Sequence, residues 1–405
     1  MALRQRLSVV FASERLLPAV GGAERFALEW LAAIATRHEV RACYLRSAAS
    51  DAAAISEPPP GIALLPAEPP TACSGYWTSR RLRRETIGLA VTGALARQRA
   101  DVVVTQLHAG PAVVGAAHGA GAPVVVLLPS YEALCKYAFD AGSRCRPRSR
   151  CRACPKAAEL SAAEADELRA SRRAHERALA AAQRLVAPSH AVAEACAAWC
   201  GRRPDVVPPV AAASPIEPAR VDGHLVVAAS RWNPNKGLAL LEPLCEALAH
   251  RRIVVGGGGL PEHVRARLGR LRHVRLMIAP LTRLLPGASA LLVPSQWPEP
   301  FGRVAFEGLA GGVPTLAGAV GGLPEFVPAD QLVRPSASVP AWEAAVRRLE
   351  EPGAWEASRL AGAAAARSLV ADPPVLRLEA IVREAAGAHS PRWHPRAPTE
   401  RSARS

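Results

Sequence analysis

Residues 294–314 read PSQWPEPFGRVAFEGLAGGVP, and this segment is the most informative part of the chain about its function. Two prolines, Pro298 and Pro300, flank Glu299, and Gly302 follows closely. Proline removes backbone donors and glycine permits unusual dihedral angles, so the spacing predicts an irregular turn. The carboxylate of Glu299 is therefore expected on a turn and not within a regular element.

A short helix is predicted directly after this turn. From Arg303 onward, Val304, Phe306 and Leu309 recur at helical spacing, and two glycines then end the pattern. The first N–H groups of a helix have no partner within it, so this start predicts a phosphate site. Glu307 lies just over one turn into the helix, where its carboxylate is placed to accept hydrogen bonds from hydroxyls. A polyol phosphate ligand fits this pattern.

The segments on either side support the same interpretation. An apolar run at 290–294 predicts a strand before the helix, and 313–317 predicts another after it, which makes a βαβ unit. A second glycine turn follows at 321–325, GGLPE. Two successive loops at strand ends therefore converge where doubly wound sheets bind ligands.

Residues 299–307, EPFGRVAFE, together with the later glycine turns, resemble the signature of the retaining family-four glycosyltransferases of the GT-B fold. In that family the first glutamate contacts the donor sugar and the second binds the nucleotide ribose, which implies these roles for Glu299 and Glu307. The resemblance implies further donor contacts from the residues between them: Pro300, Phe301, Gly302 and Arg303.

A second segment carries a complementary pair of cations. The predicted strand 224–229 runs on to Arg231, and Lys236 follows five residues later. Lysine is rare here: the 50 lysines and arginines include lysine only at 136, 156 and 236. Arginine offers a rigid donor fork and lysine a compact charge, which suits a pyrophosphate. The family places an arginine and a lysine at this spacing against the donor diphosphate.

The N-terminal segment matches more weakly. Residues 6–12 predict a first strand, and PAVGGAER at 18–25 leads into a helix that runs to about residue 35. The spacing differs from the dinucleotide fingerprint G-x-G-x-x-G, which argues against a hydride-transfer domain. The resemblance implies that Gly21 and Gly22 face the donor across the cleft.

Length and pattern predict two Rossmann-like α/β domains, because 405 residues exceed one ordinary core and strands alternate with helices in both halves. Residues 205–215 are proline-rich and form the candidate linker. The predicted strands lie near 6–12, 39–46, 101–105, 123–128 and 184–187, then 224–229, 252–256, 273–278, 289–294 and 313–317. The predicted units are 1–208 on the acceptor side, 209–370 for the nucleotide sugar, a helix at 371–389 that packs back on the first domain, and a disordered tail at 390–405.

Four cysteines fall within twenty residues in the first half and end in a C-x-x-C pair. Four thiolates complete a tetrahedral zinc site, although only one pair has the usual close spacing, so zinc and free thiols remain equal alternatives. Some relatives carry a cysteine-bearing insertion at this point. The candidate ligands are Cys135, Cys145, Cys151 and Cys154.

The chain departs from the family on the acceptor side. Cysteine-bearing relatives often have a His-Asp pair six residues before the first cysteine, where this sequence has Pro129 and Ser130. His108, after the predicted strand at 101–105, is the nearest replacement, although a lone histidine is more often structural. Tyr131 and Glu132 join Ser130 as acceptor candidates. The turn at 256–259, GGGG, also lacks the family's acidic residue, so donor contacts there are expected from the backbone.

The net charge of +15 has two explanations of equal weight. Arginine runs at 80–84, 144–152 and 265–275 predict peripheral contact with an anionic membrane, or else reflect an arginine-rich coding bias. Nucleic acid is not expected, because aromatic residues make up 4% and no binding motif occurs. The sequence shows neither a secretory pattern nor an apolar run of membrane-spanning length, so we expect a cytoplasmic protein, at most peripheral to the inner face of the membrane.

These features predict a retaining glycosyltransferase that moves a sugar from a nucleotide diphosphate to a hydroxyl acceptor in polysaccharide, glycolipid or natural-product synthesis. Arg231 and Lys236 would stabilise the leaving diphosphate beside Glu299, so the chemistry requires no metal cofactor. Two alternatives stay open. One is another GT-B enzyme, such as a phosphorylase or an epimerase, and the other is a non-catalytic sugar-nucleotide-binding subunit.

Overall fold

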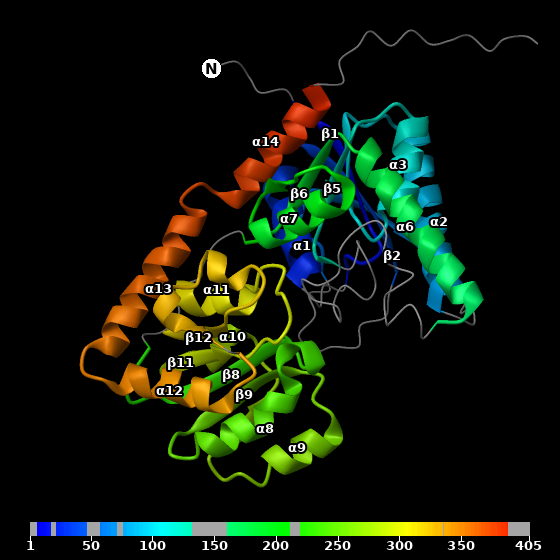
Figure 1. The fold of residues 1–405 in the computed structure, drawn as a ribbon. Helices are drawn as coiled ribbons and strands as arrows, with labels where there is room; N and C mark the ends of the chain where they lie inside the picture. Colours follow the sequence, from blue (N-terminus) through cyan, green and yellow to red (C-terminus); the bar gives the residue numbers. More distant parts are fainter. Residues whose placement is uncertain are drawn as a thin grey trace, which may run out of the picture.

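The computed structural model describes residues 6–17, 22–46, 57–70, 76–131, 160–210, 219–334 and 336–387. Two α/β halves face each other, and each is built around a parallel sheet (Figure 1). The predicted fold class is confirmed: the two sheets, of seven and six strands, have the GT-B arrangement.

The first sheet has the order β3-β2-β1-β4-β5-β6-β7, and every neighbouring pair is parallel. The strands β2 and β3 lie on one side of β1 and the later strands on the other, so the strand order reverses between β1 and β4. Parallel sheets of this kind bind ligands at such a reversal. The strands are β1 (Ser8–Ser13), β2 (Glu39–Leu45), β3 (Ile62–Ala67), β4 (Val102–Gln106), β5 (Val124–Leu127), β6 (Arg184–Ala187) and β7 (Asp205–Val206).

The second sheet has the order β10-β9-β8-β11-β12-β13 and is also parallel throughout. Its chain reversal lies between β8 and β11. The strands are β8 (His224–Arg231), β9 (Ile253–Gly258), β10 (Val274–Met277), β11 (Ala288–Val293), β12 (Thr315–Gly318) and β13 (Leu332–Val333).

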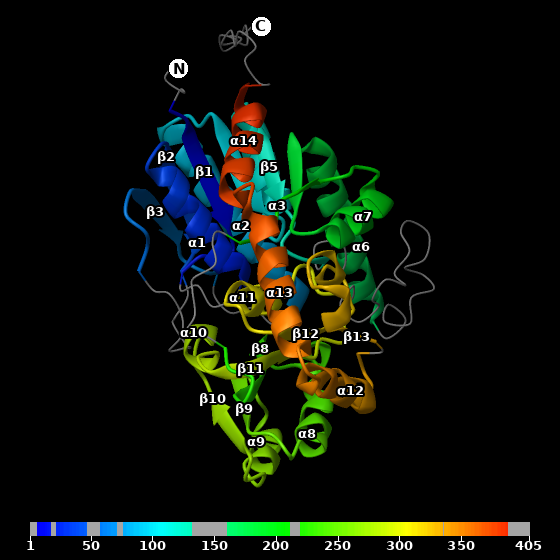
Figure 2. The ribbon, with the colours of Figure 1, turned by 90° about the vertical axis from the view of Figure 1, so that its left-hand side faces the viewer.

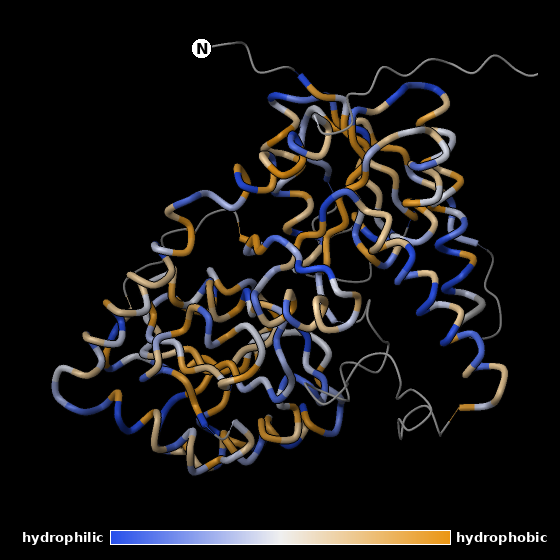
Figure 3. The backbone as a smooth tube through the Cα atoms, turned by 45° about the horizontal axis from the view of Figure 1, so that its top comes forward, coloured by the Kyte–Doolittle hydropathy of each residue, from blue (hydrophilic) through white to orange (hydrophobic). Residues whose placement is uncertain are grey.

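Helices cover both faces of each sheet, which explains why the central strands are continuous apolar runs. Neighbouring residues of β8, Val226 and Val227, enter the separate cores on opposite faces. Figure 3 shows the same division, with hydrophobic segments inside each half and hydrophilic segments along the outer helices. In the first half, α1 (Gly22–Ala35) covers one face, and α2 (Tyr76–Arg97), α3 (Gly110–Gly119), α6 (Ala162–Ala181) and α7 (His190–Cys200) cover the other. In the second half, α8 (Leu238–Ala247), α9 (Glu262–Leu268) and α12 (Val339–Glu350) oppose α10 (Leu281–Leu284), α11 (Arg303–Ala310) and α13 (Ala354–Val370).

The last helix, α14 (Pro374–Gly387), leaves the second half and packs against α1, β4 and β5 of the first. Figure 2 shows α13 and α14 running along one side of the molecule across both halves. Leu378 and Val382 of α14 belong to the same buried cluster as Phe11 of β1. The C-terminal helix therefore completes the core of the N-terminal half. Residues 388–405, with the predicted tail, lie outside the described residues.

All ten predicted strands are confirmed, with ends shifted by at most two residues. The described residues contain three further strands that were not predicted: β3, β7 and β13. β3 lies at the edge of its sheet and contains Pro66, while β7 and β13 have two residues each, too few to show a pattern. The predicted linker at 205–215 was wrong at its start, because Asp205 and Val206 pair with β6 as the last strand of the first sheet. Residues 211–218 lie outside the described residues.

Candidate active site

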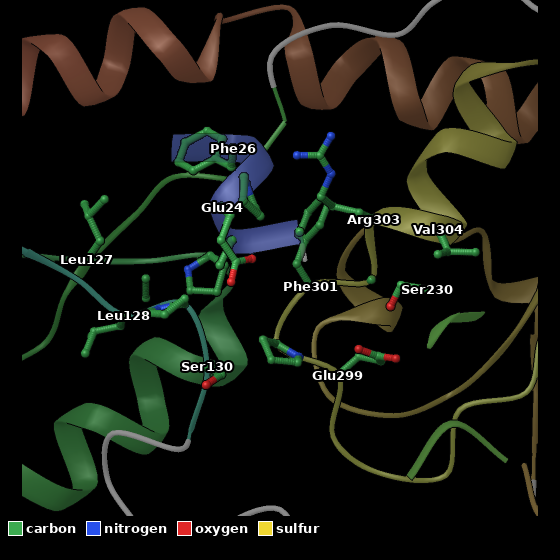
Figure 4. Close-up of a pocket in the computed structure, with 18 of the residues that line it drawn as sticks. Glu24, Phe26, Leu127, Leu128, Ser130, Ser230, Glu299, Phe301, Arg303 and Val304 are labelled. Atoms are coloured by element: carbon green, nitrogen blue, oxygen red, sulfur yellow. The ribbon is translucent and has the colours of Figure 1, made fainter. Parts of the chain in front are cut away.

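A cavity of about 460 Å³ lies between the two halves. Its walls come from strand ends and loops of both sheets, and Figure 4 shows Leu127, Leu128 and Ser130 facing Glu299 and Ser230 across it. Parallel strands present their carboxyl ends at one edge, so the fold itself brings the two halves' loops to this place.

Glu299 is the most buried charged group of the cavity wall, with 5% of its surface exposed. Its Oε1 accepts a hydrogen bond from the Lys236 ammonium group and another, of 2.5 Å, from the Ser295 hydroxyl. A buried carboxylate is tolerated only when it is paired and hydrogen-bonded, and these two donors meet that need. In the part of the chain that the structure describes, no group bonds to Oε2 of Glu299.

Glu299 is held by the second glycine turn. The backbone carbonyl of Glu299 accepts a hydrogen bond of 2.7 Å from the N–H of Gly322. A Cβ on Gly321, whose φ is +59°, would lie 2.3 Å from the backbone N and O of Glu299. The two loops quoted from the sequence therefore pack backbone against backbone, and only glycine permits this contact.

Lys236 ends a short 3₁₀ turn, Pro234–Lys236, that follows β8. Gly237 comes next with a φ of +80°, and a Cβ there would lie 2.1 Å from the carbonyl oxygen of Pro294. The glycine thus lets this turn approach the loop after β11 closely. The Lys236 ammonium also lies 5.2 Å from the ring centroid of Trp297, which adds a cation–π contact.

Arg231 stands at the last position of β8, where its side chain is exposed. Its neighbour Ser230 lines the cavity, but Arg231 is outside the lining in this structure. No ion pair of Arg231 occurs among the described residues. The side chain lies against the glycine turn after β9, since a Cβ on Gly259 would approach Arg231 Cγ within 2.8 Å. The Arg231 side chain is therefore exposed next to a residue of the cavity wall.

Arg303 links the two halves at the start of α11. Its guanidinium donates to both carboxylate oxygens of Glu29 on α1, at 2.9 and 3.3 Å, and its Nε lies 3.5 Å from Glu307 Oε1. Burial raises the pKa of Glu307, an effect that the nearby Arg303 and Arg25 oppose. Glu307 does not line the cavity, although 40% of its side chain is exposed. The predicted helix start is confirmed at Arg303.

The remaining predicted donor residues surround this point. Pro300, Phe301 and Gly302 line the cavity, and the Phe301 ring stacks on Phe326 with centroids 4.7 Å apart. Gly22 lines the opposite wall, where a Cβ would come within 3.3 Å of the Arg303 side chain. Gly21 lies outside the described residues.

The predicted acceptor residues separate into two places. Ser130 lines the cavity beside Pro129, whereas the Tyr131 ring packs edge-on against Trp297 at 6.2 Å and burial raises its pKa. His108 lies in an adjoining cavity, with its Nδ1 3.3 Å from an Arg80 nitrogen. Glu132 lies outside the described residues.

A second link between the halves was not predicted. The Glu325 carboxylate accepts hydrogen bonds of 2.8 Å from the backbone N–H groups of His190 and Ala191, at the start of α7. A carboxylate at a helix N-terminus is favourable because it meets unpaired donors and the positive end of the helix dipole. No local pattern could predict this pairing, because 135 residues separate Glu325 from His190. The same holds for Glu29 and Arg303.

The candidate zinc ligands Cys135, Cys145, Cys151 and Cys154 all lie outside the described residues. Cys196 and Cys200 lie one turn apart on α7 with their sulfurs 3.6 Å apart. The hydrogen bond between the two thiols lowers the pKa of Cys200. None of the described helices is both long enough and apolar enough to cross a bilayer.

Residues 223–351 match the family described as Glycosyl transferases group 1. We found no match among the curated proteins. Among solved structures, the chain is similar to sucrose-phosphate synthase from Thermosynechococcus elongatus, with 19% identity, a TM-score of 0.71, and coverage of 95% of this chain and 100% of that one. It is also similar to Anabaena HepE in complex with UDP and glucose, with 17% identity, a TM-score of 0.65 and the same coverage. The catalytic domain of Arabidopsis thaliana starch synthase IV, bound to ADP and acarbose, gives 12% identity, a TM-score of 0.66 and again the same coverage.

Proposed function

We propose that this protein transfers a sugar from a nucleotide diphosphate to an acceptor hydroxyl with retention of configuration. The match of residues 223–351 to the glycosyl transferases group 1 family supports the proposal. The observation that carries the proposal is the pairing of Lys236 and Glu299 in the cavity between the halves. The pair puts a cation and a buried carboxylate side by side, as a ligand with a diphosphate and sugar hydroxyls requires.

The donor would lie along the second half. Lys236 and Arg231 would bind the diphosphate, and the free N–H groups at the start of α11 add positive potential. Glu299 would accept a hydrogen bond from a sugar hydroxyl through Oε2, since Oε1 is already occupied by Lys236 and Ser295. Glu307 would accept from the ribose. The assignments of Lys236 and Glu299 rest on their positions in the cavity wall. Arg231 and Glu307 lie outside its lining, and their assignments rest on the family resemblance.

In the proposed reaction, the acceptor oxygen bonds to the anomeric carbon on the face from which the diphosphate departs. The bond between that carbon and the phosphate oxygen breaks, and a phosphate oxygen takes the acceptor's proton. Lys236 and Arg231 would stabilise the charge that accumulates on the diphosphate, which is electrostatic catalysis. Contacts between the halves, Arg303 to Glu29 and Glu325 to α7, would help exclude water from the site.

Calorimetric titration with UDP-, GDP-, ADP- and TDP-sugars tests the donor site. We expect one base to bind, and Lys236→Ala and Glu307→Ala to abolish or strongly weaken that binding. Arg347→Ala, an exposed cation of the same half, serves as the control and should bind normally. Failure of every nucleotide sugar to bind would overturn the proposal. For an active pair of substrates, NMR of the product gives the anomeric configuration, and inversion would contradict the retaining assignment.

A further inference from the structure

A second cavity of about 410 Å³ opens beside the first, entirely on the N-terminal half. It lies at the carboxyl ends of β1 and β4, where Ser13 and Gln106 form its floor. The two cavities share Ala23, Glu24 and Gln106 in their linings. A molecule could therefore extend from one cavity into the other.

The wall between the cavities is built rigidly. The Ser13 hydroxyl donates to Gln106 Oε1 at 2.8 Å, and Gln106 Nε2 donates to the carbonyl oxygen of Ala23 at 3.1 Å. Ser13 and Gln106 are both buried. The shared edge is thus fixed by hydrogen bonds between two strand ends and the start of α1.

The lining of the second cavity has more basic than acidic side chains. Arg80 and Arg83 of α2 and Arg15 after β1 line it, together with His108. Arg84 lies directly behind, where it donates to the carbonyl oxygen of His108 at 2.9 Å and to the Ser171 hydroxyl at 3.0 Å. The run of arginines at 80–84 therefore contributes to a concave site and not only to a solvated surface.

The carboxylates of the cavity do not balance these cations. Glu14 lies 3.9 Å from Arg84, with 14% of its side chain exposed, and four arginines at 15, 80, 83 and 84 surround it. Burial raises the pKa of Glu14, and the four arginines oppose that shift. Glu24 is the other acidic group of the lining. Among the described residues, Arg15 and Arg83 make no ion pair, so positive charge faces the cavity in excess.

We propose that this cavity binds an anionic group of the acceptor, a phosphate ester in particular. Arginine forks suit phosphate oxygens, and a concave basic site concentrates an anionic ligand. The inference rests on the proposed function, because it assigns the charged end of the acceptor to this cavity and its hydroxyl to the first one. The phosphate belongs either to a small phosphorylated sugar or to a lipid headgroup.

Calorimetry with glucose 6-phosphate, and with glucose as its neutral counterpart, tests the site. The titrations are run with UDP, or whichever nucleotide binds, at saturation, so that phosphate cannot occupy the donor site. We expect glucose 6-phosphate to bind and glucose to bind far more weakly. Arg83→Gln or Arg15→Gln should lower the affinity for glucose 6-phosphate about tenfold or more. Arg81→Gln is the matched control, since Arg81 lies on the same helix, is 63% exposed and pairs with Glu85.

An experiment with lipid vesicles distinguishes a phosphorylated sugar from a lipid headgroup as the acceptor. Sedimentation with phosphatidylcholine vesicles, with and without phosphatidic acid, should show binding that depends on Arg83 if the acceptor is a lipid. Failure of both the ester and the acidic vesicles to bind, with nucleotide binding intact, would overturn this inference and leave the proposed function standing. An equal loss in Arg81→Gln and Arg83→Gln would also overturn it, because it would indicate nonspecific attraction.

If no nucleotide binds, the proposed function fails, and the cavity is tested by itself. The ester titration is then repeated in the Arg231→Gln variant, which lacks the exposed cation beside the first cavity. Binding that still depends on Arg83 would support the anion site. If no binding depends on Arg83, the proposed anion site is overturned.

Discussion

Replacement of Lys236 by methionine should destabilise the second half of the protein, and replacement of Glu299 by glutamine in the same chain should restore most of the loss. Methionine keeps the length of the lysine stem and removes its charge. Glu299 would then be a carboxylate with 5% exposure and only the Ser295 hydroxyl as a partner. Glutamine at 299 is neutral and can still accept from Ser295.

The expected magnitude follows from the burial of the pair. Breaking a buried ion pair by removing one partner costs about 3–5 kcal/mol. The lower end applies because the Lys236 side chain is 18% exposed, so water from the cavity screens part of the charge. A loss of about 3 kcal/mol lowers the thermal midpoint of a unit of this size by roughly 6–12 °C. The double variant should lie within about 1 kcal/mol of the wild type, since no charge is left unpaired.

Urea unfolding followed by circular dichroism, with thermal unfolding in parallel, measures these differences. The matched control is Arg347→Met, which breaks the 2.7 Å pair with Glu343 on the outside of α12, where the arginine is 67% exposed. The control should change stability by no more than about 0.5 kcal/mol. The reasoning is refuted if Lys236→Met is as stable as the wild type, or if the second substitution gives no recovery.

Three further outcomes are expected. Glu325→Gln should weaken the contact between the halves by about 1 kcal/mol, because the helix start loses a charged partner. The ratio of molecules with this contact open to molecules with it closed should then rise roughly fivefold. Small-angle X-ray scattering should then give a larger radius of gyration, and an unchanged radius would contradict the assigned link. Gly321→Ala should abolish donor binding by pushing the Glu299 loop away, whereas Gly353→Ala, at an open positive-φ position, should retain it. Burial lowers the pKa of His175 to about 3, so the unfolded chain binds its proton first and stability falls as the pH drops below about 6.5. The effect lowers the free energy of unfolding by about 2 kcal/mol at pH 5. In urea unfolding, His175→Leu should therefore lose less stability between pH 8 and pH 5 than the wild type does.

Much of the fold could be predicted because the central strands are buried on both faces. Runs such as 102–104, VVV, and 290–293, ALLV, are continuous apolar segments, and that pattern gives strands of a parallel sheet. β3 was missed although residues 62–65, IALL, are apolar, because Pro66 follows within the same segment and proline is unusual inside a strand. Two-residue strands such as β7 are set by their neighbours and have no pattern of their own.

The candidate site was predictable where its residues are close in the chain. Glu299, Gly302 and the helix start at Arg303 form one local unit, and the prolines and glycines in this segment favour the turn directly. The partner of Glu299 could be named as a candidate cation, but the ion pair itself joins positions 63 residues apart. Only the folded second half brings the ends of β8 and β11 together.

The sequence by itself determined two α/β units, the glycine turns and the residue types at the strand ends, because local backbone preferences and apolar patterning act over a few residues. The tertiary structure alone decided which charges meet. Arg303 with Glu29, Glu325 with the start of α7, and the arginines of α2 around Glu14 all join distant segments. Long side chains with a few rotatable bonds choose partners by proximity and desolvation, and both exist only after the sheets and helices have packed.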